Sequence, residues 1–363
     1  YRQDCKLLVG DGNSFGVHLS NGDGTFSSRY PNEHNEQTSH FASRDGDNDD
    51  DETGVNIIPG DFNGDTRTDF IRLPLGQWVE DIQFTVFLSD GDGTFTTQGN
   101  DQDFEDLEGY YQGSGINLIT GDFNGDGRTD FIRQEFGKHA EDDVNSFSVY
   151  FSDGNGSFTQ APAPSIDTTL LKGQHVNNAL TAVQGAILLT GDYNGDGLVD
   201  FIRQEFGAWA ENDRNTFQVY FSQGNGDFTV VTPDGDEYQS DLKAEDGYQE
   251  PLAHESFDGS VAIPRFAGVT LFPLDMNADG RTDFIRQENG QWAQNNNDQT
   301  FQVYLSQGDG YFDILTPPQS SLPQQQLKGL HWYSSSAHDV WLRTGSIIIP
   351  GDYDGDGNVD FIS

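Results

Sequence analysis

The stretch Asp122–Asp130 reads D-F-N-G-D-G-R-T-D, and closely similar stretches occur four more times along the chain. The other copies are Asp61–Asp69 (DFNGDTRTD), Asp192–Asp200 (DYNGDGLVD), Asp275–Asp283 (DMNADGRTD) and Asp352–Asp360 (DYDGDGNVD). Phe-Ile follows every copy, which is typical of a strand that begins where the acidic stretch ends. A motif that recurs in this way predicts a repeat protein.

A second motif lies beyond each of the first four acidic stretches. Its commonest form is F-x-V-x-[FL]-S-x-G-x-G-x-F, at residues 84–95, 147–158, 217–228 and 301–312, and a fifth copy at 15–26 precedes any acidic stretch. From the first Asp of a stretch to the last Phe of this motif there are 34 to 37 residues, whereas the distance to the next stretch varies from 27 to 47. The constant part is therefore the structural body, and the variable part is a surface connection.

The body of each repeat predicts four short strands. In the second repeat we expect them at Asn117–Thr120, Thr129–Gln134, Ser146–Ser152 and Ser157–Gln160, with a glycine-rich hairpin turn between the last two. Repeated four-stranded antiparallel units favour an all-β fold, a β-propeller, over an open β-solenoid.

We predict one domain over residues 1–363. Its blades are expected at about 55–98, 116–160, 186–231 and 268–315. The N-terminus supplies a hairpin half and the C-terminus an acidic-loop half, so we expect the half-blade 1–28 to be completed by residues 346–363. A fifth blade made from both chain ends would close the ring and remove exposed sheet edges, whereas a solenoid needs no complementary terminal halves.

The composition is extremely acidic, with 60 Asp and Glu residues against 18 Lys and Arg. The resulting net charge of −42 excludes nucleic acid as a partner, because such a surface repels phosphates. No apolar run approaches the length of a membrane span. The acids recur in phase with the repeat, which favours neutralisation by bound cations over a purely solubilising role.

The acidic stretches have the donor pattern of calcium loops. Positions 1, 3, 5 and 9 carry oxygen side chains, the carbonyl of position 7 can add another donor, and calcium takes six to eight such ligands. We predict about five calcium ions, with metal-free Asx turns as the alternative. The predicted ligands are Asp61, Asn63, Asp65, Arg67 and Asp69; Asp122, Asn124, Asp126, Arg128 and Asp130; Asp192, Asn194, Asp196, Leu198 and Asp200; Asp275, Asn277, Asp279, Arg281 and Asp283; Asp352, Asp354, Asp356, Asn358 and Asp360.

The loops are not EF-hands, and they are not equal. An EF-hand needs a bidentate Glu at position 12, where this chain has Arg72, Arg133, Arg203, Arg286 and Ser363. Thr66 replaces the glycine expected at the bend of the first loop, so we expect a lower affinity there. Ala278 replaces the glycine at position 4 of the fourth loop, which we expect to matter less.

The phrase G-D-[FY]-N-G-D-G-x-x-D-[FL] resembles the FG-GAP, or VCBS, repeat of integrin α-chain propellers and of fungal and bacterial lectins. The resemblance covers essentially the whole chain, although the Gly-Ala-Pro segment of the repeat is missing. The chain is most similar to calcium-containing mushroom lectins. This resemblance implies a calcium-dependent lectin for galactose, N-acetylgalactosamine or N-acetylglucosamine, and we favour sugars of the galactose and N-acetylgalactosamine type. An integrin-like adhesion or protein-interaction propeller is the alternative, ahead of a glycosidase or lyase.

The loops between the second and third strands are the expected carbohydrate site, at the sheet ends opposite the acidic loops. They carry an aromatic residue in phase, which can stack on a sugar ring, or else pack between blades. The candidates are Trp78, His139, Trp209 and Trp292, with Gln77 and Glu211 for the hydroxyls. The last long connection, with Trp332 and Trp341, could add a second surface. We expect Arg72, Arg133, Arg203 and Arg286 to bridge carboxylates within the structure.

Several expectations concern the setting of the protein. We find no catalytic motif and expect no enzyme. The calcium demand predicts an extracellular, secreted protein whose partners are glycans. Asn155 begins a glycosylation sequon, and the single cysteine, Cys5, is either a free thiol or a link to a second chain in a homodimer. The acidic run Asp45–Glu52 is expected to be a solvated loop.

Overall fold

The computed structural model describes residues 16–29, 54–75, 84–98, 115–137, 140, 146–176, 183–207, 209–210, 216–244, 267–295, 299–318, 322–329, 331–335, 340–354 and 359–363. These residues form an all-β structure with short helical turns. They belong to two compact units, Tyr1–Pro162 and Ala163–Ser363, each of which is described by itself.

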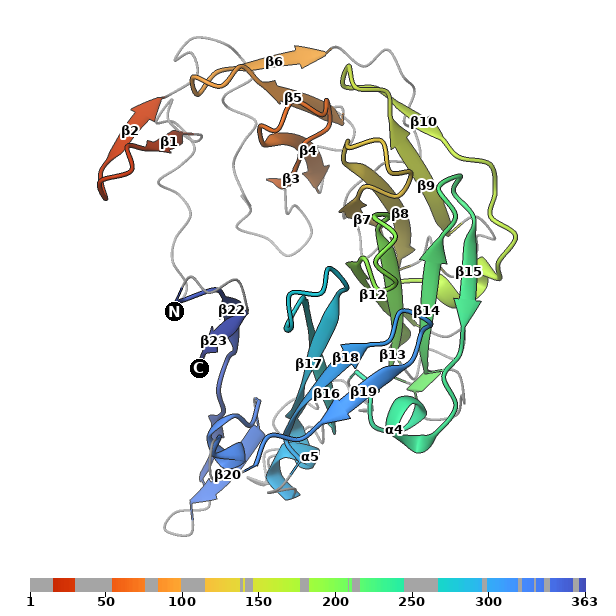
Figure 1. Cartoon of the computed structure of the whole chain (residues 1–363), viewed down its shortest axis with the longest axis vertical. Helices are drawn as coiled ribbons and strands as arrows, with labels where there is room; N and C mark the ends of the chain where they lie inside the picture. Colours follow the sequence, from red (N-terminus) through yellow and green to blue (C-terminus); the bar gives the residue numbers. More distant parts are fainter. Residues whose placement is uncertain are drawn as a thin grey trace, which may run out of the picture. The chain divides into compact units, whose positions relative to one another are not determined.

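The first unit contains one two-stranded and two four-stranded antiparallel sheets (Figure 1). The small sheet pairs β1 (Val17–Ser20) with β2 (Phe26–Arg29). The next sheet has the order β3 (Gly54–Gly60), β4 (Asp69–Leu75), β5 (Thr85–Ser89) and β6 (Phe95–Gln98). The last has the order β7 (Gly115–Gly121), β8 (Asp130–Phe136), β9 (Phe147–Ser152) and β10 (Phe158–Gln160).

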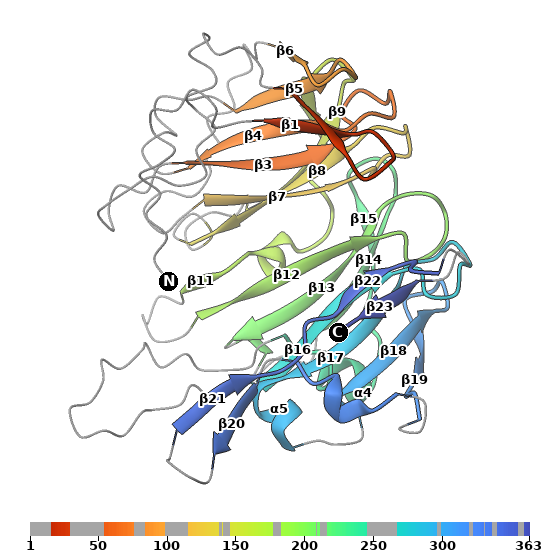
Figure 2. The same cartoon turned by 90° about the vertical axis from the view of Figure 1, so that its left-hand side faces the viewer.

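The second unit contains two larger and two small antiparallel sheets (Figure 2). After η3 (Thr168–Leu171), β11 (His175–Val176) extends the sheet of β12 (Val183–Gly191), β13 (Asp200–Gly207), β14 (Phe217–Ser222) and β15 (Phe228–Val231). Helix α4 (Asp236–Gln239) precedes the sheet of β16 (Ala267–Leu274), β17 (Asp283–Asn289), β18 (Phe301–Ser306) and β19 (Phe312–Leu315), with α5 (Gly290–Asn295) after β17. Beyond η4 (Gln324–Gln326), β20 (His331–Ser335) pairs with β21 (Val340–Thr344), and β22 (Ile349–Gly351) with β23 (Asp360–Ile362).

The predicted repeat body is confirmed, because each of the four complete repeats forms a sheet whose four strands follow chain order. The strands of the second repeat agree with the expected ones to within two residues at either end. Strand β11 and the β20–β21 pair lie in connections for which no strand was predicted. The two terminal half-blades each form a two-stranded sheet. Their union into a fifth blade, the closed ring and the single domain stay predictions.

Aromatic side chains build the same small core in every four-stranded sheet. The Phe after each acidic loop stacks on the aromatic residue opposite it on the third strand, with ring centroids 4.6 to 5.0 Å apart, in the pairs Phe70–Phe87, Phe131–Tyr150, Phe201–Tyr220 and Phe284–Tyr304. The first Phe of the fourth strand packs edge-on against the Phe that follows the acidic loop, with ring centroids 4.7 to 5.0 Å apart. This packing contributes to the high Phe content, since each of these sheets contains one such cluster.

Candidate metal loops and the opposite loops

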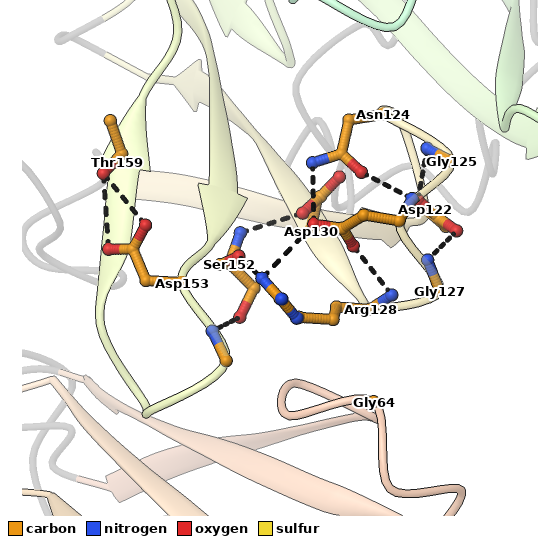
Figure 3. A network of polar contacts seen from close by, with 12 residues as sticks. Gly64, Asp122, Asn124, Gly125, Gly127, Arg128, Asp130, Ser152, Asp153 and Thr159 are labelled. Atoms are coloured by element: carbon orange, nitrogen blue, oxygen red, sulfur yellow. Dashed lines mark hydrogen bonds and ion pairs between the residues drawn. The ribbon is translucent and has the colours of Figure 1, made fainter.

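The acidic loops join the first two strands of each sheet, and their first carboxylate organises the backbone. In the second loop, Asp122 Oδ1 accepts hydrogen bonds from the backbone N–H groups of Gly125 and Asp126, at 2.7 and 3.2 Å. Its Oδ2 accepts one from Gly127 at 2.8 Å (Figure 3). The first and third loops repeat all three bonds, and the fourth repeats two of them. Position 1 therefore folds the loop around its own carboxylate, as in an Asx turn.

Positions 3 and 5 turn their oxygens toward the same loop. Asn124 Oδ1 accepts from the Asp126 N–H at 2.9 Å, and its Nδ2 donates to Asp126 Oδ2 at 3.2 Å. The guanidinium of Arg128 forms an ion pair with the same carboxylate at 3.3 Å. The equivalent ion pairs are Arg67–Asp65 and Arg281–Asp279, whereas the third loop has Leu198 at this position.

Position 9 is a fully buried aspartate in the first four loops. Asp130 Oδ2 accepts from the backbone N–H of Phe123 at 3.0 Å, and Oδ1 accepts from that of Ser152 at 2.8 Å. Asp69, Asp200 and Asp283 make the same two bonds, with the loop and with the hairpin of their own sheet. This carboxylate therefore ties the acidic loop to the third strand.

Burial raises the pKa of Asp130 to about 7, and the neighbouring Asp126 and Asp122 add to the rise. The pKa of Asp200 is raised to about 7 for the same reasons. A buried carboxylate beside two others is costly to ionise, and a bound cation would remove that cost. The hard-oxygen donor set thus fits a hard divalent ion such as calcium.

The fifth loop brings three carboxylates together. Asp352, Asp354 and Asp360 each offer an oxygen, and these oxygens lie within 4.8 Å of one another, the one such group found among the described residues. Asp356 and Asn358, also predicted as ligands, lie outside the described residues. The first four loops have Asn at position 3 and aspartates at positions 1, 5 and 9, so each carries one carboxylate fewer than the fifth loop. That any loop binds calcium stays a prediction.

The bend of each described loop needs two left-handed residues. Positions 4 and 6 both have positive φ, with Gly125 and Gly127 at 76° and 81°. Thr66 at position 6 of the first loop has φ 69°, and Ala278 at position 4 of the fourth has φ 56°. Such values cost free energy for residues with a Cβ. Both replacements therefore strain the backbone, and the expectation that Ala278 matters less than Thr66 stays a prediction.

Two of the candidate sugar-binding residues can be placed, and both make packing contacts. Trp209 and Trp292 are half-buried. The guanidinium of Arg203 lies 5.7 Å from the ring centroid of Trp209, and Trp292 packs against the core cluster of the third and fourth sheets. These contacts agree with the packing alternative without testing sugar binding. Gln77, Trp78, His139 and Glu211, together with Cys5 and the run at residues 45–52, lie outside the described residues, and the side chains of Trp332 and Trp341 are not described.

The arginines at position 12 of the loops have the predicted structural role. Where one pairs with a carboxylate, however, that carboxylate lies on the same strand and not on a neighbouring one. Three of these arginines pair with a glutamate two residues further along, and both groups are buried: Arg133–Glu135 at 2.6 Å, Arg203–Glu205, and Arg286–Glu288 at 3.0 Å. In the first sheet Pro74 takes the place of the glutamate. There Arg72 donates to Thr85 Oγ1 at 3.0 Å and lies over the ring of Phe87.

A motif in the connections escaped the sequence analysis. The phrase L-K-[GA] occurs at 171–173, 242–244 and 327–329, and its leucine is buried each time. Its lysine carbonyl accepts a backbone hydrogen bond from the segment that follows, at 2.8 to 2.9 Å, from Ala186, Val269 and Ser346. The signal is a three-residue phrase inside segments of unequal length, so spacing alone hides it.

Asn155, the candidate glycosylation site, is exposed in the turn between β9 and β10. Its Oδ1 accepts from the Ser157 N–H at 3.0 Å. Glycosylation stays a prediction. None of the described helices is long and apolar enough to cross a membrane.

Comparisons with known proteins identify the fold. No family model matches the chain, and no curated protein matches it. A similar solved structure is an Agrocybe aegerita lectin, described as recognising non-reducing terminal N-acetylglucosamine. It is 18% identical with a TM-score of 0.54, and the match covers 95% of this chain and 67% of that one. The chain therefore has a lectin-like, all-β fold.

Two rhamnogalacturonan lyases are more distant. The Bacillus licheniformis enzyme PL11 is 10% identical with a TM-score of 0.31, covering 75% of this chain and 52% of that one. The exotype lyase YesX is 11% identical with a TM-score of 0.36, covering 87% and 57%. Scores this low carry no argument about fold or activity.

Proposed function

We propose that this protein is a lectin, a carbohydrate-binding protein without catalytic activity, whose repeated acidic loops hold calcium. The observation that carries the sugar-binding part is the fold likeness to the Agrocybe lectin, which extends over 95% of the chain. The calcium part is supported by the buried aspartate at position 9, placed beside two further carboxylates in each of the first four loops.

The proposal includes a closed five-bladed propeller, in which residues 1–28 and 346–363 complete one blade. Each terminal half-blade, taken within its own unit, exposes apolar residues that most complete sheets bury. Phe26 is 63% exposed, whereas Phe158 is 3% exposed. Ile362 is 51% exposed, whereas Ile132 is fully buried. Each half-blade lacks two of the strands that a complete sheet has, which supports the proposal that it is completed by other strands.

The sugar is proposed to bind at the loops between the second and third strands. They lie at the sheet ends opposite the acidic loops, so calcium supports the frame and does not touch the sugar. Trp78, His139, Trp209 and Trp292, with Gln77 and Glu211, remain the proposed contacts. The sequence favours sugars of the galactose type, whereas the Agrocybe lectin is described as recognising terminal N-acetylglucosamine, so both kinds of sugar are candidate ligands. A secreted protein would meet calcium at roughly the millimolar level that such modules require.

A glycan array in calcium-containing buffer tests this function. We expect binding to glycans that end in galactose, N-acetylgalactosamine or N-acetylglucosamine, with inhibition by the matching free sugar. Array binding should disappear after chelation and return when calcium is restored. A blank array from protein shown to be folded and calcium-loaded would reject the lectin assignment. Capture of a protein ligand in a pull-down would then favour an adhesion propeller, and release of reducing ends from an oligosaccharide would favour an enzyme.

A further inference from the structure

Within each unit, one acidic loop is hydrogen-bonded directly to the acidic loop of the next sheet. In the first unit, the backbone N–H of Thr129 donates to the carbonyl of Asp61 at 2.7 Å, and the Asp61 N–H donates to Thr129 Oγ1 at 2.9 Å. Asp61 is position 1 of the first loop. Thr129 is position 8 of the second, between the proposed ligand residues Arg128 and Asp130.

Two further groups of the second sheet contact the first loop. Ser152, on the hairpin that also binds Asp130, donates its hydroxyl to the carbonyl of Phe62 at 2.5 Å. The side chain of Arg128 lies against Gly64, where an added Cβ would come within 3.2 Å of Arg128 Cγ. Figure 3 shows the loop of Gly64 facing the network of Arg128 and Ser152. The second sheet therefore contacts positions 1, 2 and 4 of the first loop.

The second unit repeats three of these four contacts at equivalent positions. The Thr282 N–H donates to the carbonyl of Asp192 at 2.6 Å, and the Ser306 hydroxyl donates to that of Tyr193 at 2.6 Å. A Cβ on Gly195 would come within 3.0 Å of Arg281 Cγ. Because the same geometry occurs in two separate pairs of sheets, it is a regular feature of how these sheets contact each other.

The two threonines lie close to the glycine before each contacted loop. A Cβ on Gly60 would come within 2.7 Å of both the Thr129 methyl and the Phe62 ring, and one on Gly191 within 2.6 Å of the Thr282 methyl. Only a residue without a Cβ lets the backbones approach this closely. Position 8 is valine in the third and fifth loops, Val199 and Val359, which offer no hydroxyl.

We propose that Thr129 and Thr282 are positioning residues for the metal loop of the preceding sheet, so that calcium binds in two coupled pairs of loops. The first loop pairs with the second, and the third with the fourth. Calcium at the second loop orders Arg128 and Asp130, and with them Thr129, which holds the backbone of Asp61 in its binding conformation. Coupling between two sites is reciprocal, so calcium at the first loop favours binding at the second by the same factor. The inference rests on the calcium part of the proposed function.

Calcium titration with bound ions counted by equilibrium dialysis tests this coupling. Asp126→Ala, which removes a side-chain ligand of the second loop, should lose its own ion and weaken another about fivefold or more. Thr129→Val should weaken calcium binding at the first loop by a similar factor. Thr129→Ser should restore it, because serine keeps the hydroxyl. Thr159→Val is the matched control, since Thr159 bonds only Asp153 of its own hairpin among the contacts shown.

A second set of variants distinguishes lost coupling from poor folding of a single variant. Asp65→Ala in the first loop should weaken the second loop by the same factor, and the double variant with Asp126→Ala should lose less than the sum of the single losses. The melting temperature in chelator is measured for each variant. If Thr129→Val lowered only that temperature and left calcium affinity unchanged, Thr129 would be merely structural.

The outcomes separate the inference from the function on which it rests. Wild-type protein that binds no calcium would overturn both the calcium part of the function and the coupling. Wild-type binding with strictly independent losses, one ion for each silenced loop and the other affinities unchanged, would overturn the coupling alone. Sugar binding on the array is measured separately and decides neither question.

Discussion

The two ends of each four-stranded sheet follow different rules. At the acidic-loop end, the same aspartate is buried in four sheets and makes the same two backbone hydrogen bonds. At the other end, an aromatic residue recurs in phase in the sequence, and of the two tryptophans that can be placed there, Trp209 lies beside the guanidinium of Arg203 and Trp292 packs against an apolar cluster. A geometry that repeats without change indicates a structural frame, and the opposite end of each sheet is the proposed site of recognition.

Removing calcium should have the largest effect on stability, because it acts on the acidic loops of all the repeats at once. If each loop binds with a dissociation constant of about 0.1–1 mM, 10 mM calcium stabilises the fold by roughly 1.4–2.7 kcal/mol per loop. With about five loops and the unfolding entropy of a chain of this length, thermal unfolding in excess chelator should therefore show a fall in Tm of roughly 9–18 °C. The same protein with calcium restored is the control, and an unchanged melting curve would contradict the metal assignment of the loops.

Glu205→Ala tests how much the second strand depends on its buried ion pair. The change leaves the Arg203 guanidinium buried without its carboxylate, which should lower the free energy of unfolding by about 3–5 kcal/mol. Urea unfolding in saturating calcium measures this. Glu237→Ala, at an exposed glutamate of α4, should change stability by less than about 0.5 kcal/mol. Equal effects of the two changes would show that the pair adds nothing to the fold.

Tryptophan substitutions test whether the sheet end opposite the acidic loops binds sugar. Trp209→Ala removes a half-buried ring over Arg203 and should cost about 2 kcal/mol of stability. Trp78→Ala should instead weaken sugar binding while Tm stays within about 2 °C of wild type. Both variants need both readouts, glycan affinity and thermal unfolding. Should Trp78→Ala lose stability and keep its sugar, that tryptophan packs and does not recognise.

Glycine substitutions at the strained bends should give the smallest effect, in the stabilising direction. Thr66→Gly and Ala278→Gly relieve a left-handed conformation costing about 1–3 kcal/mol, offset by about 0.5–1 kcal/mol of added chain entropy in the unfolded state. Each should gain about 1 kcal/mol in chemical unfolding. Thr97→Gly, in the extended strand β6, is the control and should lose stability. A gain for Thr66 alone would restore the ranking expected from sequence.

Much of the fold could be predicted because its decisive contacts are local. The loop bonds of Asp122 span three to five residues, and the glycine hairpins close over four. Such contacts leave a fixed spacing in the sequence, so the four strands of each repeat and the acidic loops between them could be found. The glutamate partners of Arg133, Arg203 and Arg286 were missed although they lie only two residues away, because the prediction looked across strands.

The contacts between sheets could not be predicted in the same way. Ser306 and Tyr193, which meet through one hydrogen bond, are 113 residues apart. Thr129 and Asp61 are 68 residues apart. A threonine beside a buried aspartate looks, in sequence, like any strand residue, and the glycine at position 60 or 191 looks like part of a turn. The connections also hid β11 and the L-K-[GA] phrase, since their lengths differ.

The sequence by itself determined the repeat unit, the all-β class and the position of every acidic loop, because hydrogen-bonding and hydrophobic patterns along a short segment specify a hairpin or a loop wherever it stands. Only the tertiary structure decided which residues of one sheet hold the loop of the next. Docking two sheets depends on the shape and hydrogen bonding of surfaces that each sheet presents only after it has folded. The acidic loops look alike as sequence, and the folded chain distinguishes the first and third, which the next sheet of the same unit contacts.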